Sequence, residues 1–128
     1  MRRFFRYALL VIAGIFLAAI VVQVFFAGLM LFGQEGGTGL HVNTGYILGT
    51  AGALFVVVPA LARAGRTAIV LGIVLAVVTF FQGSLALARD TSPFIAALHP
   101  VNALLIFTLA LVLSRRALAL VRTERQAT

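Results

Sequence analysis

The fold is decided by a long apolar segment, residues 7–32, which reads YALLVIAGIFLAAIVVQVFFAGLMLF and contains no charged side chain. A helix needs about 20 apolar residues to cross the hydrocarbon core of a bilayer. The arginines before the segment resemble the start of a signal peptide, but the segment is far longer than the apolar region of about 7–15 residues in such peptides. We therefore interpret it as an uncleaved transmembrane helix.

Three further apolar stretches are long enough to cross a membrane. The sequence thus predicts an all-α fold, an integral membrane four-helix bundle with up-down-up-down order, in one transmembrane domain of residues 1–128. The helices are expected at about 7–32, 41–62, 67–88 and 94–121. Residues 34–39 are expected to form a flexible outer loop. Ser92 is expected to cap the helix that Pro93 opens, and the tail after Ala117 is expected to lie at the membrane interface.

The composition excludes a soluble enzyme. Of the 128 residues, 62% are hydrophobic and 10% are charged, whereas soluble domains average about 45–50% apolar and about 25% charged residues. The sequence has no cysteine, which excludes disulfides, thiolate metal sites and thiol nucleophiles. The function must therefore be sought among the few polar side chains.

The charges predict how the bundle is oriented. The ten basic residues are all arginine, and only Arg89 lies on the side of Glu35 and Asp90. The other nine, on the opposite side, are Arg2, Arg3, Arg6, Arg63, Arg66, Arg115, Arg116, Arg122 and Arg125. Positively charged loops stay in the cytoplasm, so we expect a multi-pass protein of the bacterial cytoplasmic membrane with both termini cytoplasmic. The arginine-rich tail suits anionic lipid headgroups, and no nucleic-acid binding is expected.

The two halves of the sequence resemble each other. Gln23 in the first span precedes His41 by 18 residues, and Gln82 in the third span precedes His99 by 17 residues. An asparagine follows each histidine closely, at positions 43 and 102. The chain therefore reads as a duplicated helical hairpin whose two copies run in the same direction.

The spans contain no acidic residue, which argues against a proton-coupled transporter because such proteins usually carry an intramembrane carboxylate. The glutamines and threonines of the spans have two interpretations. They either form interhelical hydrogen bonds, worth about 0.6–2 kcal/mol each, or line a cavity for a cofactor or substrate.

The two histidines lead to a more specific hypothesis about function than the glutamines and threonines do. His41 and His99 are the only histidines, and both lie near the outer start of an even-numbered helix. Such helices lie diagonally in a four-helix ring, about 11–14 Å apart if neighbouring axes are about 8–10 Å apart. A diagonal pair can hold a haem with one imidazole on each face. The alternative is that each histidine caps a helix or contacts headgroups. Zinc fits less well because a third protein ligand is missing, and copper lacks a flanking Met or Cys.

The residues expected around the two histidines suit a flat cofactor. From His41 the same helical face continues through Gly45, Gly49 and Gly52, a strip without side chains. The sequence therefore predicts His41 and His99 as iron ligands of a haem b. The residues expected to contact this cofactor are Gly45, Gly49, Gln23, Gln82 and Asn102. The alternative for the glycines is close helix packing.

The segments His41-Val-Asn-Thr-Gly-Tyr and Leu98-His99-Pro-Val-Asn-Ala, each preceded by its glutamine, resemble small four-helix bacterial membrane proteins. The architecture is also similar to one half of a haem A synthase, which places haem-ligating histidines on the second and fourth helices of each four-helix bundle. That family has a glutamate close before its first histidine, where this chain has Gly37, and a second bundle that this chain lacks. The resemblance therefore implies haem b binding by His41 and His99 and no catalytic residue.

With both axial positions filled by histidine, no site for oxygen remains, so electron transfer or haem carrying is expected. Two alternatives stay open. One is a non-catalytic accessory or scaffold subunit of a membrane complex, and the other is a small transporter or a quinone- or lipid-binding protein. The expected partners are the lipid bilayer and either a membrane protein complex or further copies of the chain.

Overall fold

The computed structural model describes residues 1–126, so the last two residues of the expected domain, 127–128, lie outside the described residues. The described chain is all-α and has no strand. Its elements are α1 (Arg2–Leu31), α2 (Gly37–Gly52), α3 (Leu54–Leu61), α4 (Arg66–Leu87), the 3-10 turn η1 (Ala88–Asp90), α5 (Pro93–Ala96) and α6 (Leu98–Gln126). This confirms the predicted fold class.

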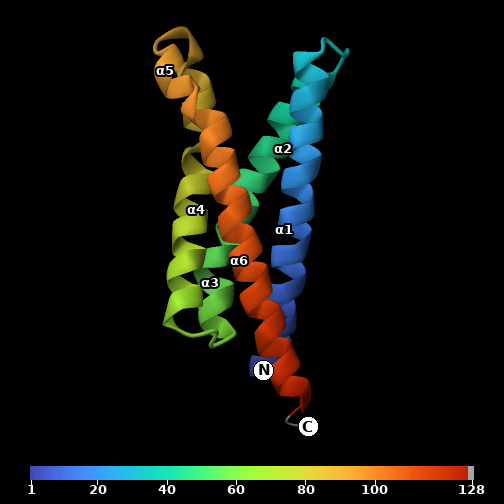
Figure 1. The fold of residues 1–128 in the computed structure, drawn as a ribbon, viewed down its shortest axis with the longest axis vertical. Helices are drawn as coiled ribbons and strands as arrows, with labels where there is room; N and C mark the ends of the chain where they lie inside the picture. Colours follow the sequence, from blue (N-terminus) through green and yellow to red (C-terminus); the bar gives the residue numbers. More distant parts are fainter. Residues whose placement is uncertain (127–128) are drawn as a thin grey trace.

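Four spans are long and apolar enough to cross a membrane: Arg2–Leu31, Gly37–Leu61, Arg66–Asp90 and Pro93–Gln126. The up-down order brings the start of α1, the end of α6 and the α3–α4 turn to the same end of the bundle (Figure 1). We call this end, which holds the nine clustered arginines, the basic end. The opposite end, which holds His41 and His99, is called the histidine end. The arrangement is compatible with a multi-pass membrane protein.

The four spans form a ring in sequence order. α1 packs against α2, α3 and α6, and α4 packs against the same three helices. Among the described residues, α1 does not pack against α4, and α2 does not pack against α6. The second and fourth spans are therefore diagonal, as the sequence predicts.

The predicted start of the first helix and the predicted end of the last helix are wrong, because both helices are longer than expected. The first helix begins at Arg2 rather than near residue 7, and the last continues to Gln126 rather than ending near residue 121. The tail after Ala117 is not a separate interfacial segment, because Ala117 and Val121 are buried in the bundle. Their spacing continues the apolar stripe of α6, so burial extends the helix through its arginines.

The second span starts earlier than predicted and is interrupted. α2 begins at Gly37, which shortens the outer connection to residues 32–36. A Cβ atom on Gly37 would lie 2.7 Å from the backbone nitrogen of Met30, so only glycine fits this close return to α1. At the other end of the second span, Ala53 separates α2 from α3. At the second outer connection Ser92 occupies the position before Pro93, but its side chain forms no capping hydrogen bond.

Pro59 explains the contact between α3 and α4. A proline has no N–H to donate to the carbonyl four residues earlier and crowds that carbonyl, which here belongs to Phe55. The carbonyl of Phe55 approaches Gly72 of α4 so closely that a Cβ atom there would lie 2.2 Å from it. The proline on one helix and the glycine on the other therefore form one packing feature.

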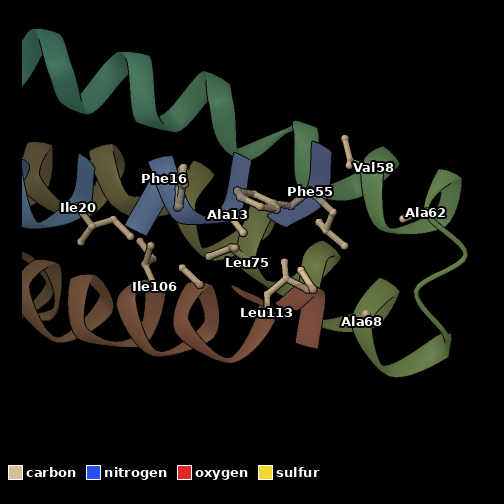
Figure 2. Packing of buried hydrophobic residues seen from close by; sticks show 13 residues of the cluster. Ala13, Phe16, Ile20, Phe55, Val58, Ala62, Ala68, Leu75, Ile106 and Leu113 are labelled. Carbon is tan, nitrogen blue, oxygen red and sulfur yellow. The ribbon is translucent and has the colours of Figure 1, made fainter. Parts of the chain in front are cut away.

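The hydrophobic core fills only the basic half of the bundle. Figure 2 shows its side chains meeting between the helices. Phe16 and Phe55 are in edge-to-face contact, with ring centroids 5.0 Å apart. On each span the buried residues stop at one level, at Ile20, Gly52, Thr79 and Ile106. Beyond this level, toward the histidine end, Gly37 is the only buried residue in the described chain.

Burial also supports the predicted duplication. The buried residues of α1 are Leu9, Ala13, Phe16 and Ile20, and those of α4 are Ala68, Gly72, Leu75 and Thr79. Each position in the second set lies 59 residues after its counterpart, which is also the separation of Gln23 and Gln82. Two hairpins thus present the same pattern of side chains to a shared core.

Candidate functional site

The candidate site lies directly beyond the core, where the predicted polar residues come together. Each hairpin supplies a glutamine from its first helix and a histidine from its second: Gln23 of α1 with His41 of α2, and Gln82 of α4 with His99 of α6. All four residues are half-buried. The structure thus assembles two similar clusters of hydrogen bonds at the same end of the bundle.

In the first hairpin, glutamine and histidine bind each other twice. Gln23 Nε2 donates to the backbone carbonyl of His41 at 2.6 Å, and His41 Nδ1 lies 3.2 Å from the backbone carbonyl of Gln23. The hydroxyl of Thr44 donates to Gln23 Oε1. Both polar ends of the glutamine side chain are satisfied, and the imidazole ring is fixed against α1.

The second hairpin repeats this pairing. Gln82 Nε2 donates to the carbonyl of His99 at 3.0 Å, and His99 Nδ1 lies 2.9 Å from the carbonyl of Gln82. Asn102 Nδ2 donates to Gln82 Oε1 at 2.6 Å and to the carbonyl of Val78 at 2.8 Å. Asn102 therefore acts on its histidine through Gln82.

The structure changes one member of the predicted repeat. Asn43 is exposed, and the residue that corresponds to Asn102 is Thr44. Thr44 and Asn102 each lie three residues after a histidine, on the helical face that points to the glutamine. The signal in the sequence was the shared spacing after each histidine, which the asparagine at position 43 obscured.

The hydrogen bonds select one tautomer of both histidines. A backbone carbonyl can only accept, so Nδ1 of His41 and of His99 must donate its proton to the glutamine carbonyl. In the neutral ring, the lone pair then lies on Nε2. Histidines that bind metals usually donate their other ring N–H to a carboxylate, a backbone carbonyl or water, and a backbone carbonyl takes this role here.

The two rings meet across the diagonal of the bundle. Their centroids are 6.1 Å apart, and the ring planes are inclined by 67°. Two imidazoles on opposite sides of one metal ion should have centroids about 6 Å apart, if each metal–nitrogen bond is about 2.0–2.1 Å and each nitrogen lies about 1.1 Å from its ring centre. The observed separation of the ring centroids is close to this distance.

A bare metal ion would lack ligands at this place. Residues 1–126 contain no group of three or more histidine, cysteine, aspartate or glutamate side chains able to hold a metal. A haem iron needs only two ligands from the protein because the macrocycle supplies four nitrogens. The donor set therefore suits a haem better than zinc or copper.

The glycine strip divides into positions with different neighbours. A Cβ atom on Gly45 would lie 3.0 Å from Gln23 Nε2, so this glycine makes room for the glutamine that holds His41. A Cβ atom on Gly52 would lie 3.2 Å from the methyl group of Thr79, so Gly52 serves helix packing. Of these three glycines, only Gly49 has no atom within 4 Å of its Cβ position. It keeps the open surface that the sequence predicted for a flat cofactor.

Beyond the site the bundle opens. Figure 1 shows α1 and α2 in one arm and α4, α5 and the start of α6 in the other, with the two arms diverging toward the histidine end. His41 and His99 come from different arms. Since this half has no buried hydrophobic side chain among the described residues, a bound apolar ring would not have to displace a packed core.

Comparison with protein-family models, curated proteins and solved structures found no match for this chain. The similarity to half of a haem A synthase therefore stays an expectation from the sequence, and the functional argument depends on the geometry of the two glutamine–histidine pairs.

Proposed function

We propose that the protein binds one haem b with His41 and His99 as its axial ligands and serves as an electron carrier or a haem-carrying subunit in the membrane. The observation that carries the proposal is the pair of imidazoles from diagonal helices, 6.1 Å apart, each bound through Nδ1 to a glutamine carbonyl. In both hairpins Nδ1 is bound in the same way, which leaves the same atom, Nε2, of each histidine for an axial bond.

The residues of the chain would hold and tune the haem. His41 and His99 would supply their Nε2 atoms, and the carbonyls of Gln23 and Gln82 would fix the ring orientations and increase the basicity of the ligands. The open surface at Gly49 would let the macrocycle approach α2. A bound haem supplies one-electron exchange between ferric and ferrous iron, and two protein ligands leave no coordination position for oxygen.

The membrane placement supports the same function. The nine arginines of the basic end favour a cytoplasmic location for that end. With this orientation, the proposed haem site would lie in the outer half of the bacterial cytoplasmic membrane. A haem at this depth suits electron transfer with a membrane-bound partner or with a protein at the outer surface.

The test is an optical spectrum of the detergent-purified full chain, oxidised and reduced, with haem quantified per chain. We expect one haem b per chain and a sharp α-band on reduction, and loss of this band in His41→Ala and in His99→Ala. Asn43→Ala is the matched control, because Asn43 is polar and close in sequence but exposed and outside the hydrogen-bond clusters. A colourless preparation from haem-replete cells contradicts the proposal.

One observation favours a second candidate, a non-catalytic scaffold subunit. In each pair the glutamine and the histidine bind each other twice, and these hydrogen bonds connect α1 to α2 and α4 to α6. In that case the histidines would serve only to join helices. A His41→Ala/His99→Ala double variant that still co-purifies with a membrane complex, from cells in which the parent binds no haem, supports this alternative.

A further inference from the structure

The basic end has a cavity that the haem proposal does not use. It has a volume of about 290 Å³ and lies between α1, the α3–α4 turn and α6. Its lining residues are Arg6, Ala64, Arg116, Ala119, Leu120 and Thr123. The volume is near the lower end of the range for small-molecule sites, about 300–1,000 Å³.

The lining divides into a polar part and an apolar part. Arg6 and Arg116 offer two guanidinium groups, whereas the hydroxyl of Thr123 already donates its proton to the backbone carbonyl of Ala119. The remaining wall consists of alanine methyls and the side chain of Leu120. Guanidinium groups bind phosphate oxygens with paired, charge-assisted hydrogen bonds. A ligand with a phosphate at one end and a hydrocarbon chain at the other would match both parts.

The two arginines differ in what they already bind. Arg6 donates to the carbonyl of Ala62 and pairs with Glu124, both at 3.4 Å, which joins α1, α3 and α6. Arg116 has no hydrogen bond or ion pair with any residue between 1 and 126. Its charge faces the cavity without a counterion from the described chain, while Arg6 is held in place beside it.

The surrounding charge favours an anion from the membrane. The nine arginines gather at this end together with a single acidic residue, Glu124. Clusters of arginine next to a membrane span attract anionic headgroups. Because free phosphate has no apolar part, the alanines and Leu120 favour a lipid as the source of the phosphate.

We propose that this cavity binds the phosphate of an anionic phospholipid, with Arg116 as the main contact and Arg6, which its own hydrogen bonds hold in place, as the second guanidinium group beside it. The bound lipid would connect the first and last helices of the bundle through their basic ends. This site lies at the opposite end from the histidines, so it does not depend on haem binding.

The experiment measures thermal unfolding of the full chain in detergent as phosphatidylglycerol or phosphatidylcholine is added. A lipid that binds only the folded protein raises the unfolding temperature as its concentration rises. We expect a saturable rise with phosphatidylglycerol and a much smaller one with phosphatidylcholine. Arg116→Gln should weaken the apparent phosphatidylglycerol affinity about tenfold, the loss expected for a charge-assisted contact.

Arg115→Gln is the matched control, because it removes the same charge one residue away, outside the cavity lining. It should change the affinity by less than about twofold, as expected for an exposed charge. Equal losses in the two variants mean a diffuse attraction to the membrane and overturn the site. An equal rise with inorganic phosphate overturns the assignment to a lipid.

Discussion

The basic half and the histidine half of this bundle use the same four spans in opposite ways. In the basic half, large and small residues interlock into a core that includes Phe55 at 0% exposure. In the histidine half, the described residues form hydrogen-bond clusters and no hydrophobic core. Because lipid is as apolar as the side chains, helices in a membrane associate mainly through packing. Stability should therefore reside in the basic half, which leaves the histidine half free to hold a ligand.

The largest loss of stability in the basic half is expected for Gly72→Val. A Cβ atom at position 72 would lie 2.2 Å from the backbone carbonyl of Phe55, so α3 and α4 would have to separate. Overpacking of a core costs about 1–3 kcal/mol and occasionally more, and this contact with rigid backbone should exceed that range. We expect loss of the folded bundle, measured as aggregation during size-exclusion chromatography in detergent.

The control for Gly72→Val is Gly83→Val in the same helix. Gly83 is exposed, and its Cβ position has no atom within 4 Å. This variant should fold like the parent chain. Similar damage from both substitutions would mean that the loss does not depend on the contact between Gly72 and Phe55.

The next largest effect is expected for Phe55→Ala. Phe55 is fully buried and contacts Phe16 edge to face. Removing a buried phenylalanine side chain costs about 3–5 kcal/mol, which should appear as a much lower denaturant midpoint in detergent. Phe81→Ala, at an exposed position of the histidine half, should stay within about 0.5 kcal/mol of the parent. Equal losses would mean that the histidine half is packed as tightly as the basic half.

The four spans and the two glutamine–histidine pairs could be predicted because hydropathy and residue spacing can be read directly from the amino-acid sequence. It did not predict the role of Thr44, since the choice between positions 43 and 44 depends on where α2 begins and therefore on which face meets Gln23. The contact of Gly72 with Phe55 was also hidden, because it joins two helices through a carbonyl that Pro59 leaves without its usual donor. The last helix was predicted too short, since its arginines obscured the regular spacing of Ala117 and Val121.

A smaller effect on stability, with a large effect on the ligand, is expected for His41→Ala and His99→Ala. Each substitution removes one hydrogen bond to a carbonyl on the facing helix, worth about 0.6–2 kcal/mol in a membrane. The haem-free variants should unfold within that range of the haem-free parent, whereas haem content should fall to near zero. A loss of stability as large as that of Phe55→Ala would assign the histidines to the fold rather than to a ligand.

The smallest change tests whether the two hairpins contribute equally. Gln23→Met and Gln82→Met keep the length of the side chain and the backbone carbonyl that holds each histidine, but remove the amide that binds the histidine carbonyl. Loss of such supporting contacts typically lowers metal affinity about 10- to 100-fold, so haem should dissociate faster from both variants. Gln82→Met should have the larger effect, because it removes the side-chain acceptor of Asn102 and leaves only the carbonyl of Val78. In Gln23→Met, by contrast, the single hydroxyl proton of Thr44 can turn to the carbonyl of Leu40. Haem transfer to an excess of apomyoglobin measures both rates, and a faster loss from Gln23→Met would reverse the order inferred for the two arms.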